Sequence, residues 1–204
     1  ALSRDNTYTN PVFPMGGSQF TLSGKFTLPY SLFNDIDYAN LGDQPDYQDD
    51  DGNPDQAKID QERFKWLEFY KIKFKGTWYT RLINKFVLKA HAEFGFLGAY
   101  NNDRGVIPFE RFFLGGDGLG SYSLDGREAI ALRGYPNQSL SSQDGGTIYN
   151  KFSLELRYPI TLKASAKIYA LTFLEGGASY NSFKDYNPFE LYRSAGLGIR
   201  IFMP

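Results

Sequence analysis

Arg133 is the residue whose surroundings most clearly indicate chemistry. It lies in the run AIALRGYPNQ, between Leu132 and the pair Gly134-Tyr135, and it follows the glycine-rich stretch PFERFFLGGDGLG at 108–120. Such glycines give the backbone the freedom to follow tight paths. A guanidinium presents a planar fork of N–H donors that can hold two carboxylates at once. The residue type and its setting therefore predict an ionic anchor, and a solvated arginine in a surface loop is the alternative.

Two carboxylates are the candidate partners of Arg133. Glu155 and Glu175 lie in two later strand-like segments, and Glu155 shares the polar face of its segment with Lys151 and Ser153. Adjacent antiparallel strands could bring both carboxylates to one place, where a carboxylate shielded from water would need a partner. We therefore predict that the loop carrying Arg133 folds inward and is fixed to the wall of a barrel.

Other candidate sites are weaker. Asp49-x-Asp51-x-Asn53 is similar to the start of a calcium loop, but Pro54 replaces the glycine that an EF-hand needs at its sixth position. A solvated acidic loop is the favoured reading of residues 43–60. His91 is the only histidine and there is no cysteine, so a His/Cys zinc site is excluded, and His91 is predicted to be a polar residue of the lumen. No G-x-S-x-G elbow or P-loop occurs, so we expect neither catalytic residues nor a cofactor.

Composition limits the class of protein. The 204 residues suffice for one domain, and the net charge of −1 argues against a nucleic-acid partner. No apolar run approaches the length of a membrane helix, and the first residues lack the features of a signal peptide. The chain is therefore either cytosolic or an internal piece of a processed, larger protein, and the strand pattern favours the second option.

Period-two alternation of apolar and polar residues recurs along the chain, and this pattern is typical of strands with one apolar and one wet face. About seven strands are predicted. The clear ones are 19–28, 70–78, 86–96, 149–158 and 193–201, and the weaker ones are 166–180 and a strand within 1–13.

An outer-membrane barrel explains these strands better than a soluble β-sandwich does, although both alternate. The segments reach the roughly ten residues that a tilted membrane strand needs, and short connections at 81–85 and 159–165 alternate with long ones. Aromatic residues at segment ends could form the two interfacial girdles. These residues are Tyr70, Trp78, Tyr149, Tyr158, Tyr180 and Tyr192.

These residues together resemble the BamA family of outer-membrane assembly factors. That family has a long loop folded into its barrel with an arginine-glycine-aromatic motif, which Leu132-Arg133-Gly134-Tyr135 matches with Leu and Tyr in place of the commoner Val and Phe. Glu155 and Glu175 look like the acidic wall residues that contact this arginine. The stretches PFERFFLGG at 108–116 and VFPMGGSQFTLSGKFTLP at 12–29 are also similar to family segments.

The resemblance implies an all-β, antiparallel transmembrane β-barrel, of which residues 1–204 supply about seven of sixteen strands. It implies a partial barrel domain whose POTRA domains and lateral gate lie elsewhere. The implied function is the insertion and folding of β-barrel proteins in the bacterial outer membrane. The implied partners are the lipid bilayer, nascent outer-membrane proteins and accessory lipoproteins of an assembly complex.

Three alternatives remain open at this stage. A secretion pore of the same superfamily, of the two-partner type, would share the arginine motif. An outer-membrane lipase or protease would need a catalytic triad, and a plain porin would conduct ions without inserting clients.

Overall fold

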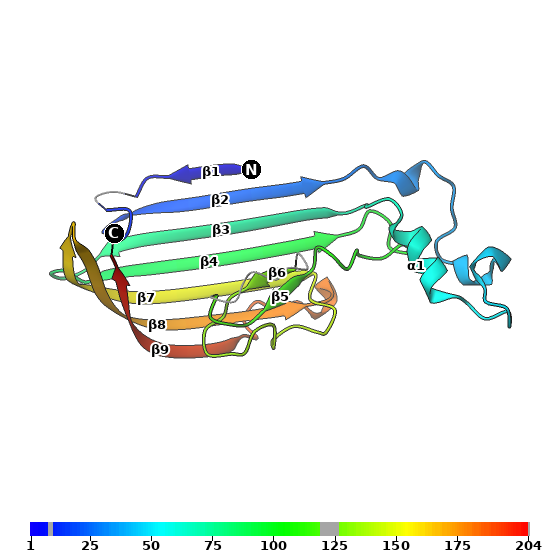
Figure 1. Cartoon of the computed structure of the whole chain (residues 1–204). Coiled ribbons are helices and arrows are strands. Elements are labelled where there is room, and N and C mark those ends of the chain that lie inside the picture. Colours follow the sequence, from blue (N-terminus) through cyan, green and yellow to red (C-terminus); the bar gives the residue numbers. More distant parts are fainter. Residues whose placement is uncertain (8–9, 119–126, 204) are drawn as a thin grey trace.

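The computed structural model describes residues 1–7, 10–118 and 127–203, and within these ranges seven strands form one antiparallel sheet (Figure 1). The sheet has the order β1-β2-β3-β4-β7-β8-β9. Its strands therefore follow one another as they do in the chain, except that a long segment separates β4 from β7. The strands are β1 (Leu2–Asp5), β2 (Gly17–Phe26), β3 (Tyr70–Arg81), β4 (Val87–Gly98), β7 (Ile148–Lys163), β8 (Ala166–Tyr180) and β9 (Tyr192–Phe202). The seven predicted strands are confirmed.

The two faces of the sheet have the inverse polarity of a soluble protein. On β7, Ser153 is buried while its neighbour Leu154 is exposed, and the same alternation makes Leu174 on β8 and Leu197 on β9 exposed by 59% and 86%. The buried face carries polar and charged side chains, including Glu93, Glu155, Arg157 and Glu175. Such a sheet is stable where its outer face meets hydrocarbon and its inner face is polar.

Two details of the hairpin between β7 and β8 differ from the prediction. The connection predicted at 159–165 is mostly strand, because β7 continues to Lys163 and a register shift between Pro159 and Thr161 accommodates the proline. A bulge is a place where proline's missing N–H breaks no ladder bond. Tyr149, predicted in an outer girdle, is fully buried. It has the same parity as Lys151 and Glu155 and therefore faces inward.

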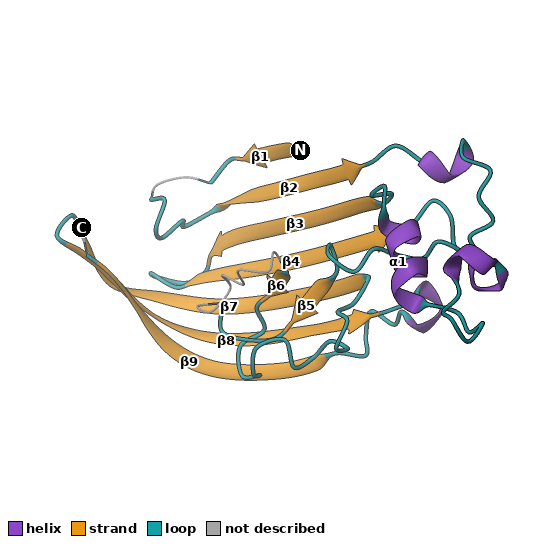
Figure 2. Cartoon of the chain, turned by 45° about the vertical axis from the view of Figure 1, so that its right-hand side comes forward, coloured by secondary structure: helices purple, strands orange, loops and turns teal. Residues whose placement is uncertain are grey.

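Between β4 and β7 the structure describes residues 99–118 and 127–147, which fold back over the inner face of the sheet, and we call these two stretches the inward segment (Figure 2). It contains a short parallel pair that the sequence pattern did not predict, β5 (Phe112–Leu114) with β6 (Glu128–Ile130). Leu119 and Gly120, the end of the glycine-rich stretch, lie outside the described residues.

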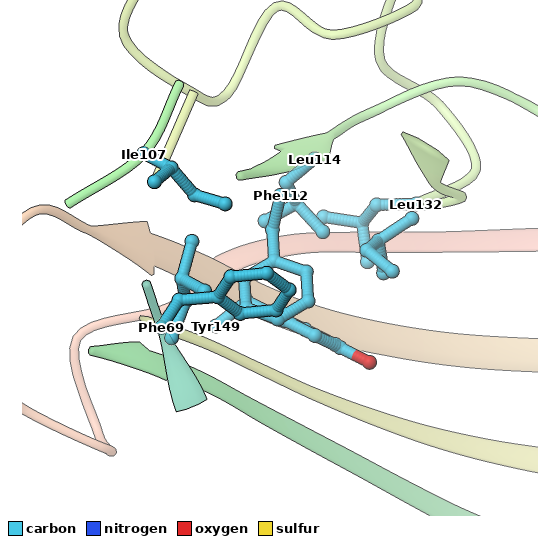
Figure 3. Packing of buried hydrophobic residues seen from close by; sticks show 8 residues of the cluster. Phe69, Ile107, Phe112, Leu114, Leu132 and Tyr149 are labelled. Atoms are coloured by element: carbon cyan, nitrogen blue, oxygen red, sulfur yellow. The ribbon is translucent and has the colours of Figure 1, made fainter. Parts of the chain in front are cut away.

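An apolar cluster holds the inward segment against the wall (Figure 3). The rings of Phe112 and Tyr149 meet edge to face with their centroids 4.7 Å apart. Burying a large apolar side chain stabilises a fold by about 1.5–3 kcal/mol, so this cluster supplies much of the adhesion. Its buried members are Phe69, Leu97, Ile107, Phe112, Leu114, Ile130, Leu132 and Tyr149.

A second cluster lies toward the β7–β8 turn and uses the segment that precedes β2. Phe13 is fully buried there and packs edge to face on Tyr169 of β8, with ring centroids 5.1 Å apart. Val87 and Leu171 complete the buried core of this cluster. Residues before β2 thus cover part of the inner face.

The acidic connection between β2 and β3 contains helix α1 (Gln56–Phe64) and the short helices η1 (Tyr30–Leu32), η2 (Leu41–Asp43) and η3 (Pro45–Tyr47), where the sequence predicted only a loop. The carboxylate of Asp55 caps α1 by accepting the N–H groups of Ala57 and Lys58. A last short helix, η4 (Phe183–Asp185), follows β8. Within the described residues, no helix is both long and apolar enough to span a membrane.

We expect Leu174→Lys to lower the free energy of unfolding in lipid vesicles by about 2–4 kcal/mol, because a lysine near the middle of a spanning strand would enter hydrocarbon. Gln61→Lys, on the exposed face of α1, is the control and should leave stability unchanged. Denaturant titration of the full-length protein measures both. A change of under about 0.5 kcal/mol for Leu174→Lys, as at ordinary surface positions, would contradict contact with lipid.

Candidate ionic anchor

Arg133 lies on the inner face of the sheet, between β7 and β8. Its Nη2 donates to Oε1 of Glu155 at 2.8 Å and to Oε1 of Glu175 at 2.7 Å. Its backbone N–H donates to Oε2 of Glu175 at 2.9 Å. The structure therefore brings together the arginine and both carboxylates that the sequence singled out, and we call this group the arginine anchor.

The register of the two strands explains why both carboxylates are within reach. Ser153 pairs with Glu175, and Glu155 pairs with Phe173, so the two glutamates lie on the same face and two residues apart along the ladder. Diagonal neighbours on one face of an antiparallel pair lie within reach of one long side chain. A single guanidinium can therefore contact both.

The guanidinium also contacts an aromatic ring. Its carbon Cζ lies 3.7 Å from the centroid of Phe173, which is the cross-strand partner of Glu155. A cation above an aromatic face gains about 0.5–2 kcal/mol, depending on how far it is desolvated. Partial burial acts against the charge of Arg133, but the hydrogen bonds and charges of Glu175 and Glu155 outweigh it and raise its pKa.

Glu155 is the most crowded member of the anchor, with a side chain only 1% exposed. Arg157 donates to its Oε2 through Nε at 2.8 Å and Nη2 at 2.5 Å, and Arg200 of β9 approaches its Oε1 at 3.4 Å. Lys89 of β4 lies 3.9 Å from Oε2. One buried carboxylate thus joins cations from three strands and the inward segment.

The two residues after Arg133 extend the contact to β9. Gly134 has φ = +90°, a conformation that favours glycine, and a Cβ added there would lie 3.2 Å from Cβ of Ser194. The hydroxyl of Tyr135 donates to the carbonyl of Arg193 at 2.8 Å. The motif Arg133-Gly134-Tyr135 therefore fastens β7, β8 and β9 together.

Leu132, the first residue of the motif, is fully buried in the apolar cluster beneath the inward segment. The motif thus combines an apolar contact, a cation that donates to two carboxylates, a backbone turn and an aromatic hydrogen-bond donor. Each residue type has a separate physical task.

The sequence did not predict three residues that contact the arginine anchor. These residues are Arg157, Arg200 and Phe173. The parity that placed Glu155 on the polar face of β7 places Arg157 there too. Parity also places Arg200 on the polar face of β9, but its contact with Glu155 reaches across β8 and has no local sequence signal.

The remaining sequence candidates have structural surroundings of their own. His91 lies on the inner face, where its Nδ1 is 2.8 Å from the hydroxyl of Thr77 and its Nε2 is 2.7 Å from Glu93. The Asp49 carboxylate accepts the N–H groups of Asp51 at 3.0 Å and Asn53 at 2.8 Å, which shapes a turn. Among the residues that the structure describes, no cluster of His, Asp and Glu could hold a metal ion.

A polar cavity of about 240 Å³ lies beside the arginine anchor. Its lining carries charges of both signs, so it favours neither an anion nor a cation. The lining residues are Lys89, His91, Glu93, Asp117, Ala131, Arg133, Lys151, Ser153, Glu155, Glu175 and Arg200.

Comparison with known proteins agrees with this architecture. A family model described as the Omp85 superfamily domain matches residues 1–204. Among solved structures, the chain is similar to BamA from Haemophilus ducreyi lacking POTRA domains 1–3, with a TM-score of 0.55 and 19% sequence identity. The match covers 98% of this chain and 34% of the other, so the chain spans about a third of its length. No curated protein matches. The likeness confirms the predicted BamA-like barrel fold.

We expect Arg133→Ala to lower the free energy of unfolding by about 3 kcal/mol, the lower end of the range for breaking a buried ion pair, because Arg157 and Arg200 still face Glu155. Arg133→Lys should recover part of the loss, since lysine keeps the charge but lacks the planar guanidinium that lies over the ring of Phe173. Heat-dependent mobility of the full-length protein in detergent gels measures the effect. Unchanged heat resistance in Arg133→Ala would contradict a structural role for the anchor.

A second expected outcome concerns Gly134. Gly134→Ala should cost about 1–2 kcal/mol from the left-handed backbone, and more from its approach to Ser194. Gly52→Ala is the matched control, because Gly52 has φ = +79° but no atom within 4 Å of the added Cβ. If denaturant titration shows equal costs for the two variants, the close packing of Gly134 on β9 is unimportant.

Proposed function

Because this chain belongs to the Omp85 superfamily, we propose that it forms part of a protein that inserts and folds β-barrel proteins in the bacterial outer membrane. The observation that carries the proposal is the arginine anchor on the inner face of a sheet whose outer face is apolar. The fold and the family support a place in the membrane. The anchor supports a task that needs an internally fixed segment.

The proposed mechanism needs no nucleotide and no covalent step. A client strand would pair with an exposed edge of the barrel, so that its backbone N–H and C=O groups find partners that lipid does not offer. This exchange requires a barrel that yields at one place and keeps its shape elsewhere. Residues 1–204 would supply wall of fixed shape, because Arg133 connects β7 and β8 and Tyr135 connects to β9.

The position of the inward segment favours pairing of a client strand at the barrel wall over passage of a polypeptide through the lumen. Phe112 and Leu132 are fully buried between this segment and the inner face of the sheet. Passage of a polypeptide along this face would require loss of that apolar contact together with the ion pairs of Arg133. Pairing at the wall leaves both intact.

The proposed partners follow from the exposed apolar face and from the resemblance to the BamA family. The lipid bilayer would cover the exposed apolar side chains, such as Leu174 and Leu197, and nascent outer-membrane proteins would be the clients. Accessory lipoproteins of an assembly complex would help to deliver those clients. We propose the bacterial outer membrane as the location.

We expect Arg133→Ala to reduce the rate of client insertion severalfold in vesicles that contain the full-length protein, because the wall beside the anchor loses its fixed shape. Lys184→Ala, in the exposed short helix after β8, is the control and should insert clients at the normal rate. The assay follows protease protection and heat-resistant folding of a newly synthesised barrel protein.

Two results would contradict the proposal. Normal insertion by Arg133→Ala would separate the anchor from the function. A wild-type protein that moves a soluble exoprotein across the vesicle membrane but inserts no barrel protein would identify a secretion pore of the same superfamily.

A further inference from the structure

Lys71 forms a second ionic group with the inward segment, far along the sheet from Arg133. Its side chain is 3% exposed and lies on the inner face of β3. Its Nζ lies 2.6 Å from Oε2 of Glu128 and 3.0 Å from Oε2 of Glu110, and it donates to the carbonyl of Glu110 at 2.7 Å. Both glutamates belong to the inward segment, so the wall supplies the cation here.

Neighbouring lysines complete this group. Lys73 of β3 donates to Oε1 of Glu128 at 2.7 Å, and Lys25 of β2 donates to Oε1 of Glu110 at 2.5 Å. Lys71 also lies 4.5 Å from the centroid of the Phe112 ring. We call Lys25, Lys71 and Lys73 with Glu110 and Glu128 the lysine anchor.

Both glutamates of the lysine anchor remain charged. Partial burial acts against the charge of Glu110, but Lys25 and Lys71 outweigh it and lower its pKa. Burial opposes the charge of Glu128 in the same way, and Lys71 and Lys73 lower its pKa. The contacts are therefore ion pairs at neutral pH.

The two anchors lie on different parts of the wall. The lysine anchor uses β2 and β3, the arginine anchor uses β7 and β8, and β4 lies between these pairs of strands. Glu128 precedes Arg133 by five residues in the chain, across β6. The inward segment thus crosses the sheet from one anchor to the other.

The anchors also have opposite polarity. The wall offers lysines at β3 and carboxylates at β7 and β8, while the segment offers Glu110 and Glu128 to the first and Arg133 to the second. If the segment were shifted so that Arg133 faced Lys71, two buried cations would meet. Like charges at a desolvated contact cost several kcal/mol, so the arrangement admits one placement of the segment.

We propose that Glu110 and Glu128 are positioning residues that hold the inward segment on β2 and β3 separately from Arg133. With both anchors closed, the segment has one orientation, and with the arginine anchor open it stays attached through Lys71. The tip at Arg133-Gly134-Tyr135 can then leave β7–β9 without the whole segment leaving the inner face. Only the use of this release in client insertion rests on the proposed function; the separate attachment of the segment does not.

Spin-label distances in the full-length protein without a client test this separation. The 204 residues contain no cysteine, so labelled cysteines can be introduced in pairs here. One pair, Asn137→Cys with Leu197→Cys, reports on the tip relative to β9. The other pair, Ala129→Cys with Ile72→Cys, reports on β6 relative to β3. Leu197 and Ile72 are exposed positions on the outer face, and Asn137 is exposed on the segment.

We expect Arg133→Ala to abolish the narrow distance distribution of the tip pair and to leave that of the β6–β3 pair narrow. The double variant with Glu110→Gln and Glu128→Gln should broaden the distribution of the β6–β3 pair and leave that of the tip pair narrow. The amides keep the shape of the carboxylates and lose their charge. Glu110→Gln by itself, which keeps the Glu128 contacts of Lys71 and Lys73, is the milder variant if the double one does not fold. It should broaden the β6–β3 distribution in the same direction.

Two outcomes would overturn the proposal. If Arg133→Ala loosens both pairs equally, the segment behaves as one unit with one anchor. If the glutamine variants leave the β6–β3 distance unchanged, the ion pairs of Lys71 do not position the segment. Because no client is present, both outcomes hold whether or not the protein inserts clients.

Discussion

The buried carboxylates of Glu155 and Glu175 constrain the rest of this structure. They lie on the inner face of two adjacent strands, beneath a segment that shields them from water. Removal of a charge from water costs several kcal/mol unless a partner is well placed, so each carboxylate requires cations. Arg157 and Arg200 meet part of this requirement for Glu155, and Arg133 meets the part that both glutamates share. The inward segment must therefore present a cation at this one position.

The same ion pairs fix the register of the wall. Side chains alternate between the two faces of a strand, so a slip of one residue would turn Glu155 and Arg157 toward the apolar exterior and Leu154 toward the polar interior. An error of this kind loses the ion pairs and places charges in hydrocarbon at the same time. The pattern that makes a strand amphipathic thus also makes its pairing unambiguous.

The sequence predicts the strands well because one local rule governs them. Alternation of apolar and polar residues located all seven strands of the main sheet and placed Glu155 on the inner face. The same rule turns Tyr149 inward, against the ring of Phe112, so its assignment to an interfacial girdle was wrong because it rested on residue type alone. The rule gives no signal where tertiary contact decides. The three-residue strands β5 and β6 are too short to alternate visibly, and they form because they pair with each other while β5 packs on β7 and β8.

The candidate site was predictable in part for a related reason. Arg133 has an unusual sequence setting, and the predicted strands together with the family resemblance indicate Glu155 and Glu175 as its partners. Lys71, Glu110 and Glu128 are equally well paired in space, yet lysines alternating on a strand are expected on any wet face. Glu110 and Glu128 follow Lys71 by 39 and 57 residues in the sequence. No local sequence pattern therefore connects the lysine with its two partners.

Apolar contact and ion pairs contribute differently to the position of the inward segment. The cluster around Phe112, Leu132 and Tyr149 provides adhesion, but apolar contact has little directional preference. Ion pairs gain less net free energy because desolvation offsets attraction, while an incorrect pairing leaves a buried charge without a partner. The clusters therefore hold the segment on the wall, and the opposite polarity of the two anchors determines where on the wall it lies. A segment held in this way can be released at Arg133 by a local exchange of charge partners while its apolar contact with the wall persists.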